Sequence, residues 1–158
     1  MLRDVLKTQD TIMSAIRDFL HEKDFTEILA PIIGPVSDPG IRSAKQVSID
    51  YYGVEYKLMS SMILYKQMAI CAIERIYSLS PNIRLEPVAT IATGRHLSEF
   101  RQMDLEVAHA TYHDTMGLAE ELLCYVTKIV LMQREEELEA LGRTLSVPSL
   151  PFKRIEYK

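Results

Sequence analysis

Hydrophobic residues recur at three- and four-residue steps over the first twenty positions of the chain. Leu2, Val5, Ile16 and Leu20 belong to this series, and charged residues stand between its members. A period close to that of the α-helix is typical of an amphipathic helix with one apolar face. The sequence therefore predicts a helix from Leu2 to Leu20.

The pattern changes after this helix. The stretch Phe25–Ile33 is short, apolar and interrupted by Pro31, which cannot donate to a sheet ladder, so we expect an edge or interface strand there. Residues 34–40 are rich in glycine and proline and predict a loop. Within residues 46–60, two β-prone pieces flank Tyr51-Tyr52-Gly53, which predicts a hairpin.

The second half of the chain changes between helical and extended patterns. We predict helices over 62–75 and 114–141, and strands over 76–86 and 98–108 joined by a loop of small residues over 87–94. Two strands that bracket one loop should pair antiparallel. Because the order of elements does not alternate as βαβ units do, the expected fold class is α+β, an antiparallel β-sheet flanked by helices.

One face of the hairpin formed by the last two strands is expected to be polar, because alternate residues of a strand share a face. Arginine can hold a phosphate through two N–H groups, an aromatic face can stack on a base, and carboxylates can orient a metal or an amino group. A nucleotide site needs such groups, although a polar face that simply meets water is the alternative. The residues of this face and its loop are Arg84, Glu86, Arg95, His96, Phe100, Gln102, Asp104 and Glu106.

Composition is that of an ordinary globular domain, with 47% hydrophobic and 25% charged residues. No apolar run approaches the ~20 residues that cross a bilayer, so we expect a soluble cytoplasmic protein with no membrane partner. The net charge of 18 − 22 = −4 argues against electrostatic capture of a nucleic acid. Cys71 and Cys124 are expected to be buried small hydrophobes, and no metal ligands are assigned.

The identities on the polar face match a known pattern. Residues 81–107, with an Arg-x-Glu start and an Asp-x-Glu end, resemble motif 2 of the class II aminoacyl-tRNA synthetases, in particular the aspartyl and asparaginyl branch. Two further segments agree in order. Residues 25–36 resemble motif 1, whose proline ends a strand at the dimer interface, and Ser60–Gln67 resembles the segment that reads aspartate in that branch. Three segments in order are a specific signal.

Within this superfamily the chain resembles most the archaeal relatives of asparagine synthetase A. The resemblance lies in Ser-Met-Ile-Leu at 61–64, in Ser80–Glu86, and in the lack of room for an N-terminal oligonucleotide-binding barrel. It implies an ATP-dependent ligase that makes asparagine from aspartate, ammonia and ATP through an aspartyl-adenylate, with Mg²⁺ as cofactor and without tRNA. The alternatives are an aspartyl- or asparaginyl-tRNA synthetase fragment and a non-catalytic paralogue with a regulatory or assembly role.

The resemblance also implies roles on the nucleotide side. Arg84 would hold the ATP α-phosphate and stabilise the charge that develops as the carboxylate attacks it. Glu86 would read the adenine amino group, and Phe100 would stack on the adenine ring. Arg95 and His96 would approach the outer phosphates.

The amino acid side is assigned in the same way. Lys66 would pair with a carboxylate of aspartate, with Ser61 in the same segment. Gln102, Asp104 and Glu106 sit where the family shapes the amino acid and metal side of the pocket. For Lys66 the alternative is a solvated lysine on a helix surface.

The chain also departs from the family. Class II sites are completed by motif 3, and nothing in the 158 − 141 = 17 residues after Leu141 resembles it. Residues 37–40 match the substrate-gripping loop of the synthetases only in part. We therefore expect 1–158 to be a single partial catalytic domain that lacks motif 3 and that forms a homodimer through Leu2–Pro31. Turnover would need motif 3 from a continuation of the gene or from a separate chain that carries it.

Overall fold

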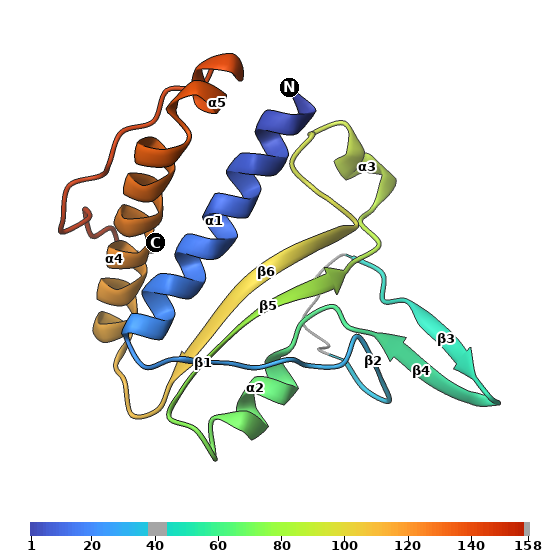
Figure 1. Cartoon of the computed structure of the whole chain (residues 1–158). Coiled ribbons are helices and arrows are strands. Elements are labelled where there is room, and N and C mark those ends of the chain that lie inside the picture. Colours follow the sequence, from blue (N-terminus) through green and yellow to red (C-terminus); the bar gives the residue numbers. More distant parts are fainter. Residues whose placement is uncertain (38–43, 157–158) are drawn as a thin grey trace. The chain divides into compact units, whose positions relative to one another are not determined.

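The computed structural model describes residues 1–37 and 44–156, and its elements fall into two compact units (Figure 1). One unit comprises Met1–Asp24 and His109–Lys158, and the other comprises Phe25–Ala108. The first unit is helical and the second holds the strands. The predicted α+β class is confirmed.

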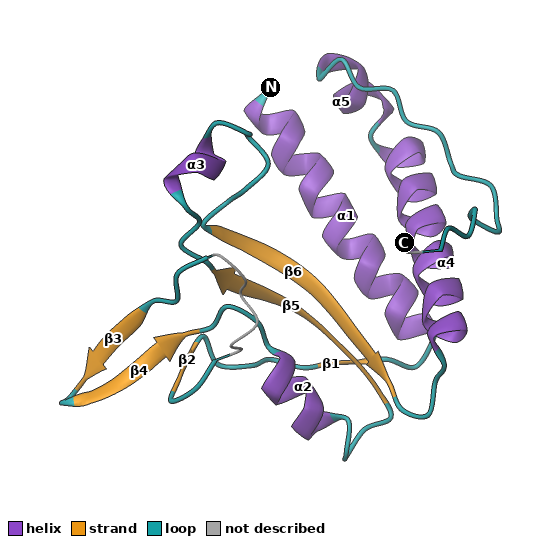
Figure 2. Ribbon diagram, turned by 180° about the vertical axis from the view of Figure 1, so that it is seen from behind, coloured by secondary structure: helices purple, strands orange, loops and turns teal. Residues whose placement is uncertain are grey.

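Three helices form the helical unit. They are α1 (Leu2–Glu22), α4 (Tyr112–Gln133) and α5 (Glu135–Ala140). Figure 2 shows α1 and α4 side by side with opposite chain directions, and the rings of Phe19 and Tyr125 meet at a centroid distance of 5.4 Å. The first helix lies where its apolar period predicts it.

The helix predicted over 114–141 is two helices. Helix α4 starts earlier because Thr111 is its N-cap, and the carboxylate of Asp114 accepts the backbone N–H of Thr111 at 2.8 Å in return. The helix ends at Arg134, whose backbone leaves the helical region and whose Nε donates to Thr11 Oγ1 at 2.6 Å. A hydrophobic period cannot show such a break, because α5 continues the same apolar spacing.

The larger sheet in the second unit has the strand order β1-β5-β6, so β6 lies at one edge of it. Strand β1 (Thr26–Glu27) pairs parallel with β5 (Arg75–Ile83), and β5 pairs antiparallel with β6 (Glu99–Val107). The antiparallel pairing of the two long strands is confirmed. Their register sets Asn82 opposite Phe100.

The smaller sheet has the order β2-β4-β3. Strand β4 (Val54–Leu58) pairs antiparallel with both β2 (Ile33–Gly34) and β3 (Ser48–Tyr51). Tyr52 and Gly53 join β3 to β4 with φ angles of 53° and 83°. Two successive positive φ angles suit a tight hairpin turn, so the predicted hairpin is confirmed.

The single strand predicted over Phe25–Ile33 is wrong in its extent. The segment forms two short strands in different sheets, with Pro31 between them. Met59 links the sheets, since its N–H donates to the carbonyl of Ile32 and its carbonyl accepts from Ile83, each at 2.8 Å. In the loop predicted over 34–40, Gly34 is part of β2, and residues 38–40 lie outside the described residues.

Two short helices differ from expectation. Helix α2 (Ile63–Ala69) ends before the predicted limit of 75, because Arg75 already starts β5 and the chain must turn back before it. The predicted loop 87–94 contains α3 (Val88–Ile91), which starts after Pro87. Proline is well suited to a helix start.

The cysteines are not buried as expected. Cys71 is exposed in the turn after α2 and Cys124 is half-buried on α4, and both are free thiols. No helix among the described residues is long and apolar enough to cross a membrane.

Candidate functional site

The register of β5 and β6 builds one polar sheet face. Cross-strand partners in an antiparallel pair point to the same side, so three pairs share this face. They are Ser78 with Asp104, Ser80 with Gln102, and Asn82 with Phe100. The face predicted for β6 is present, and β5 contributes Ser78, Ser80 and Asn82 to it in addition to the predicted residues.

A cavity of about 260 Å³ lies where this face passes into the loop after β5. All five residues predicted for the nucleotide side line it, and Leu97 is an additional lining residue. The lining residues are Arg84, Glu86, Arg95, His96, Leu97 and Phe100.

Arg84 is held from two sides at this cavity. Its Nε donates to the carbonyl of Ser60 at 3.0 Å, and its Cζ lies 5.2 Å from the centroid of the Phe100 ring. Ser60 is itself anchored, because its N–H donates to Ser37 Oγ at 3.1 Å. The guanidinium is therefore fixed at one edge, while its terminal N–H groups have no acceptor among the described residues.

The loop groups are more open. Arg95 and His96 are exposed, and His96 Nδ1 lies 3.2 Å from Thr93 Oγ1. The same hydroxyl accepts the backbone N–H of Arg95 at 3.3 Å. Thr93 thus orders the loop next to both cationic candidates.

An ion cluster lies further along the polar face. Lys66 Nζ is 3.1 Å from Asp104 Oδ1 and 2.7 Å from Glu106 Oε1. Lys66 is only 8% exposed, so the alternative of a solvated surface lysine is wrong. Burial by itself would lower the pKa of Lys66, but the hydrogen bonds and charges of Glu106 and Asp104 outweigh it and raise that pKa above its usual value.

Two amides extend this cluster towards the cavity. Gln102 Nε2 donates to Asp104 Oδ1 at 3.0 Å, and Asn82 Nδ2 donates to Gln102 Oε1 at 2.8 Å. Asn82 was not predicted as a site residue. The signal was available, because Asn82 has the same strand parity as Arg84.

Some buried polar atoms on this face have no partner among the described residues. They are Ser80 Oγ, Asn82 Oδ1 and Asp104 Oδ2. Buried polar atoms are nearly always hydrogen-bonded, and exceptions gather at functional sites. Ser61 lies just before α2, where its hydroxyl accepts the N–H of Ile63 at 3.3 Å.

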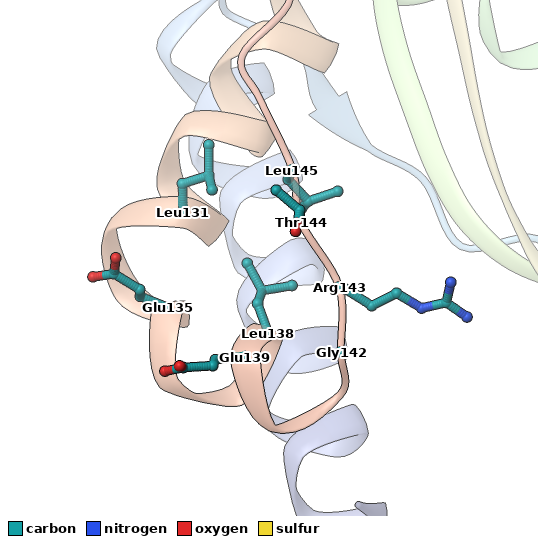
Figure 3. A pocket seen from close by; sticks show the side chains of 8 residues that line it. All are labelled: Leu131, Glu135, Leu138, Glu139, Gly142, Arg143, Thr144 and Leu145. Atoms are coloured by element: carbon teal, nitrogen blue, oxygen red, sulfur yellow. The ribbon is translucent and has the colours of Figure 1, made fainter.

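A second hollow, of about 540 Å³, lies in the helical unit between α4, α5 and the segment after them (Figure 3). Leu131, Leu138 and Leu145 line it, and the carboxylates of Glu135 and Glu139 point outward in this view. It contains none of the predicted site residues. The candidate site is therefore the polar face of the β5–β6 pair.

A protein family matches the whole chain. The model of the tRNA synthetases class II (D, K and N) matches residues 1–158. The chain belongs to this family. The resemblance of the chain to the aspartyl and asparaginyl branch is confirmed.

Two relatives of this chain are named as tRNA ligases. The asparagine–tRNA ligase of Desulforamulus reducens is 35% identical over 97% of this chain and 35% of its own length. The aspartate–tRNA(Asp/Asn) ligase of Sulfurisphaera tokodaii is 33% identical over 99% of this chain and 35% of its own. The chain thus spans about a third of the length of these relatives.

Solved class II structures agree. Asparaginyl-tRNA synthetase from Pyrococcus horikoshii, complexed with asparaginyl-adenylate, covers 87% of this chain with a TM-score of 0.80 and 30% identity, and the match spans 31% of that chain. The asparaginyl-tRNA synthetase of Entamoeba histolytica covers 97% of this chain with a TM-score of 0.83 at 24% identity, which shows the shared fold.

The interpretation as an asparagine synthetase A relative, and with it asparagine biosynthesis from ammonia, is wrong. The relatives are named as asparagine– and aspartate–tRNA ligases. One of the features that suggested the other branch, the 61–64 segment, has a packing explanation. Met62 is 1% exposed, and its sulfur accepts the Ser78 hydroxyl at 3.1 Å, so the unusual 61–64 segment is adapted to the core of this chain.

Proposed function

We propose that this chain binds ATP and an amino acid of the aspartate–asparagine pair as part of the catalytic core of an aspartyl- or asparaginyl-tRNA ligase. One observation carries the proposal. The cavity of Arg84 and Phe100 and the ion cluster of Lys66 lie on the same polar face of one strand pair. Such a face lets a nucleotide phosphate and an amino acid carboxylate approach each other on fixed strands.

On the nucleotide side, the fixed guanidinium of Arg84 is directed to the α-phosphate. Its terminal N–H groups would stabilise the negative charge that develops when the carboxylate attacks. Phe100 would stack on the adenine ring, and Glu86 would accept from the adenine amino group. Arg95 and His96, on the exposed loop, would contact the outer phosphates.

On the amino acid side, Lys66 is the cation available to a substrate carboxylate. Two carboxylates already surround it, those of Asp104 and Glu106. They fix the ammonium in place, and Gln102 fixes Asp104 in turn. Ser61, at the start of α2, would contribute its hydroxyl to the same ligand.

Mg²⁺ is expected to accompany ATP. The described residues contain no group of three metal-ligating side chains, and Asp104 and Glu106 are engaged by Lys66, so these residues do not form a metal site by themselves. Mg²⁺ commonly keeps water and phosphate oxygens as most of its ligands. We therefore assign no catalytic step to the ion.

The acceptor of the activated amino acid is inferred to be tRNA(Asp) or tRNA(Asn). The names of the relatives support this acceptor, and they weigh against the expectation, drawn from net charge, that tRNA is not a partner. Filter binding of tRNA to the chain at low and physiological salt tests whether these residues contribute. Binding that falls steeply with salt would indicate phosphate contacts.

A dimer is the assembly we propose, through the motif 1 region. In the helical unit, the start of α1 exposes Leu2 and Leu6, at 71% and 54%. In the other unit, Leu29 is 93% exposed beside Pro31. Each unit thus exposes apolar side chains of its own, and exposed apolar side chains of this kind favour a protein interface. A sedimentation coefficient of a compact monomer at micromolar concentration would contradict this assembly.

Isothermal titration of the chain with ATP, aspartate and asparagine tests the main proposal. We expect ATP to bind, one of the two amino acids to bind better than the other, and glutamate, one methylene longer, to bind more weakly than both. A non-hydrolysable aminoacyl-adenylate analogue should bind more tightly than either ligand, because it occupies both halves of the face. If a folded sample binds neither ATP nor the analogue, the proposal fails.

A further inference from the structure

One buried amide on the polar face has no role in the binding described above. Asn82 is 0% exposed, near the end of β5. Asparagine is depleted in strands, and burial of an amide costs free energy unless its groups are hydrogen-bonded. An apolar residue would fit this position in the sheet without that cost, so the amide calls for a chemical explanation.

The charge of Asp104 fixes the direction of the hydrogen bonds in this network. An ionised carboxylate only accepts, so the Gln102 atom that faces it at 3.0 Å must be the donor Nε2. Gln102 Oε1 then faces Asn82 and accepts from Nδ2 at 2.8 Å. If Gln102 turned over, both bonds would become repulsive contacts, so each amide has one orientation.

The same oxygen of Asp104 also accepts from Lys66. Its Oδ1 lies 3.0 Å from Gln102 Nε2 and 3.1 Å from Lys66 Nζ. The position of the ammonium is therefore coupled, through one carboxylate oxygen and one amide, to Asn82. Bonds in such a chain strengthen one another in a low-dielectric interior.

We propose that Asn82 is a positioning residue for the amino acid half of the site. By donating to Gln102 it holds the Asp104 carboxylate, and with it the Lys66 ammonium, in one arrangement. The identity of the ligand in this inference rests on the proposed function. The hydrogen-bonded chain itself is a property of the free protein.

The proposal predicts an effect at a distance. Asn82 is the cross-strand partner of Phe100, on the nucleotide side, yet its donor leads towards Lys66, on the amino acid side. Loss of the Asn82 amide should therefore weaken binding of the amino acid and leave binding of ATP nearly unaffected. If Asn82 only supported the fold, its loss would weaken the binding of both ligands together.

The test compares Asn82→Ala with Ser80→Ala. Ser80 is a matched control, because it lies two residues away on the same strand face, is 7% exposed, and has a hydroxyl with no partner among the described residues. Asn82→Ser keeps a donor on a shorter side chain, and it is used if Asn82→Ala does not fold. We expect it to have a smaller effect in the same direction.

The first measurement needs no ligand. NMR detects the side-chain amide of Gln102, whose N–H donates to Asp104. In Asn82→Ala the Gln102 oxygen loses its donor and the amide is held less firmly, so we expect its exchange with solvent to become about three- to tenfold faster. Ser80→Ala should leave that exchange unchanged. Equal Gln102 exchange in the wild type and in Asn82→Ala overturns the proposal.

The second measurement is calorimetric titration with aspartate, asparagine and ATP. We expect the Kd of the bound amino acid to rise about three- to tenfold in Asn82→Ala and that of ATP to change less than about twofold. The double variant Asn82→Ala/Gln102→Ala should bind the amino acid no more weakly than Gln102→Ala alone, because both changes break the same series of hydrogen bonds. Additive effects, or an equal loss of ATP, overturn the proposal. A wild type that binds neither ligand refutes the proposed function instead, and the Gln102 exchange then decides this inference alone.

Discussion

The guanidinium carbon of Arg84 lies 5.2 Å from the centre of the Phe100 ring. The contact joins the residue that follows β5 to β6 at the cavity that Arg84 and Phe100 line, and a cation over an aromatic face is a favourable arrangement. It also sets the two groups that would hold the phosphate and the base of ATP at a fixed separation. Changes at the two positions should therefore be separable by ligand.

Arg84→Ala should weaken ATP binding by about 1.5–3 kcal/mol, or roughly ten- to a hundredfold, because it removes a charge-assisted contact with phosphate. Calorimetric titration measures the loss. Arg101→Ala is the control, since Arg101 is exposed and has the opposite parity on β6. Equal ATP affinity in both variants would mean that the polar face only meets solvent.

Phe100→Ala should weaken ATP by about 0.5–1.5 kcal/mol and leave the amino acid nearly unaffected, because stacking acts on the base alone. Phe100→Tyr keeps the ring and should keep the affinity. Titrations with ATP and with aspartate or asparagine separate the cases. A parallel loss of amino acid affinity in Phe100→Ala would contradict the division of the face into two halves.

Lys66 makes the stability of the chain depend on alkaline pH. Its pKa in the folded state is raised above the ordinary 10.5 by Glu106 and Asp104, against the effect of burial. A lysine with a raised folded pKa contributes stability below its unfolded pKa, and this contribution is lost as the pH rises through the folded pKa.

Urea unfolding of wild type and Lys66→Met should therefore differ by a constant free energy from neutral pH up to about pH 10, and the difference should narrow above it. Lys66→Met should also lose affinity for the amino acid while it keeps its affinity for ATP. Glu55→Gln, in an exposed ion pair with Lys57, is the control and should show no such narrowing. A difference that stays constant through pH 11 would refute the coupling.

Gly34 lies tight against α2. A Cβ atom at this position would be 2.8 Å from Tyr65 Oη and 3.2 Å from Met59 Cε. Gly34→Ala should destabilise the chain by up to about 1 kcal/mol in thermal or urea unfolding, because the ends of two side chains must shift, and Tyr65→Phe in the same chain should restore part of the loss by removing the hydroxyl.

The control for this prediction is Gly117→Ala. Gly117 is within α4 and has no atom within 4 Å of an added Cβ, so alanine should stabilise the helix by about 0.5–1 kcal/mol. Destabilisation of similar size at both positions, or no rescue by Tyr65→Phe, would show that the Gly34–Tyr65 approach is not the cause.

The sequence predicts elements well where the period is long or the turn is specific. Helix α1, the β3–β4 hairpin and the β5–β6 pair are examples, because each is fixed by residues that are neighbours in the chain. The sequence predicts element boundaries poorly where they depend on residues that are distant in the chain. The break at Arg134 depends on Thr11, and the division of Phe25–Ile33 depends on the pairing of its two halves with β5 and β4.

The candidate site divides in the same way. Strand parity brings Arg84 and Phe100 together from sequence alone, and motif resemblance adds Lys66. Strand parity places Asn82 on the same face, but it does not encode the diagonal bond from Asn82 to Gln102 or the contact of Arg84 with the Ser60 carbonyl. One of the features that pointed to the wrong branch, the unusual 61–64 segment, includes a buried packing contact, that of Met62.

The position of β6 at the edge of its sheet affects how the isolated chain behaves in solution. Among the described strands it pairs with β5 alone, so every second amide along its nine residues points away from a partner. Two such edges can join by backbone hydrogen bonds, and concentrated samples should therefore aggregate through strand addition. Deuterium exchange would identify this association by slowed exchange of β6 amides, whereas association through the start of α1 would leave those amides unchanged.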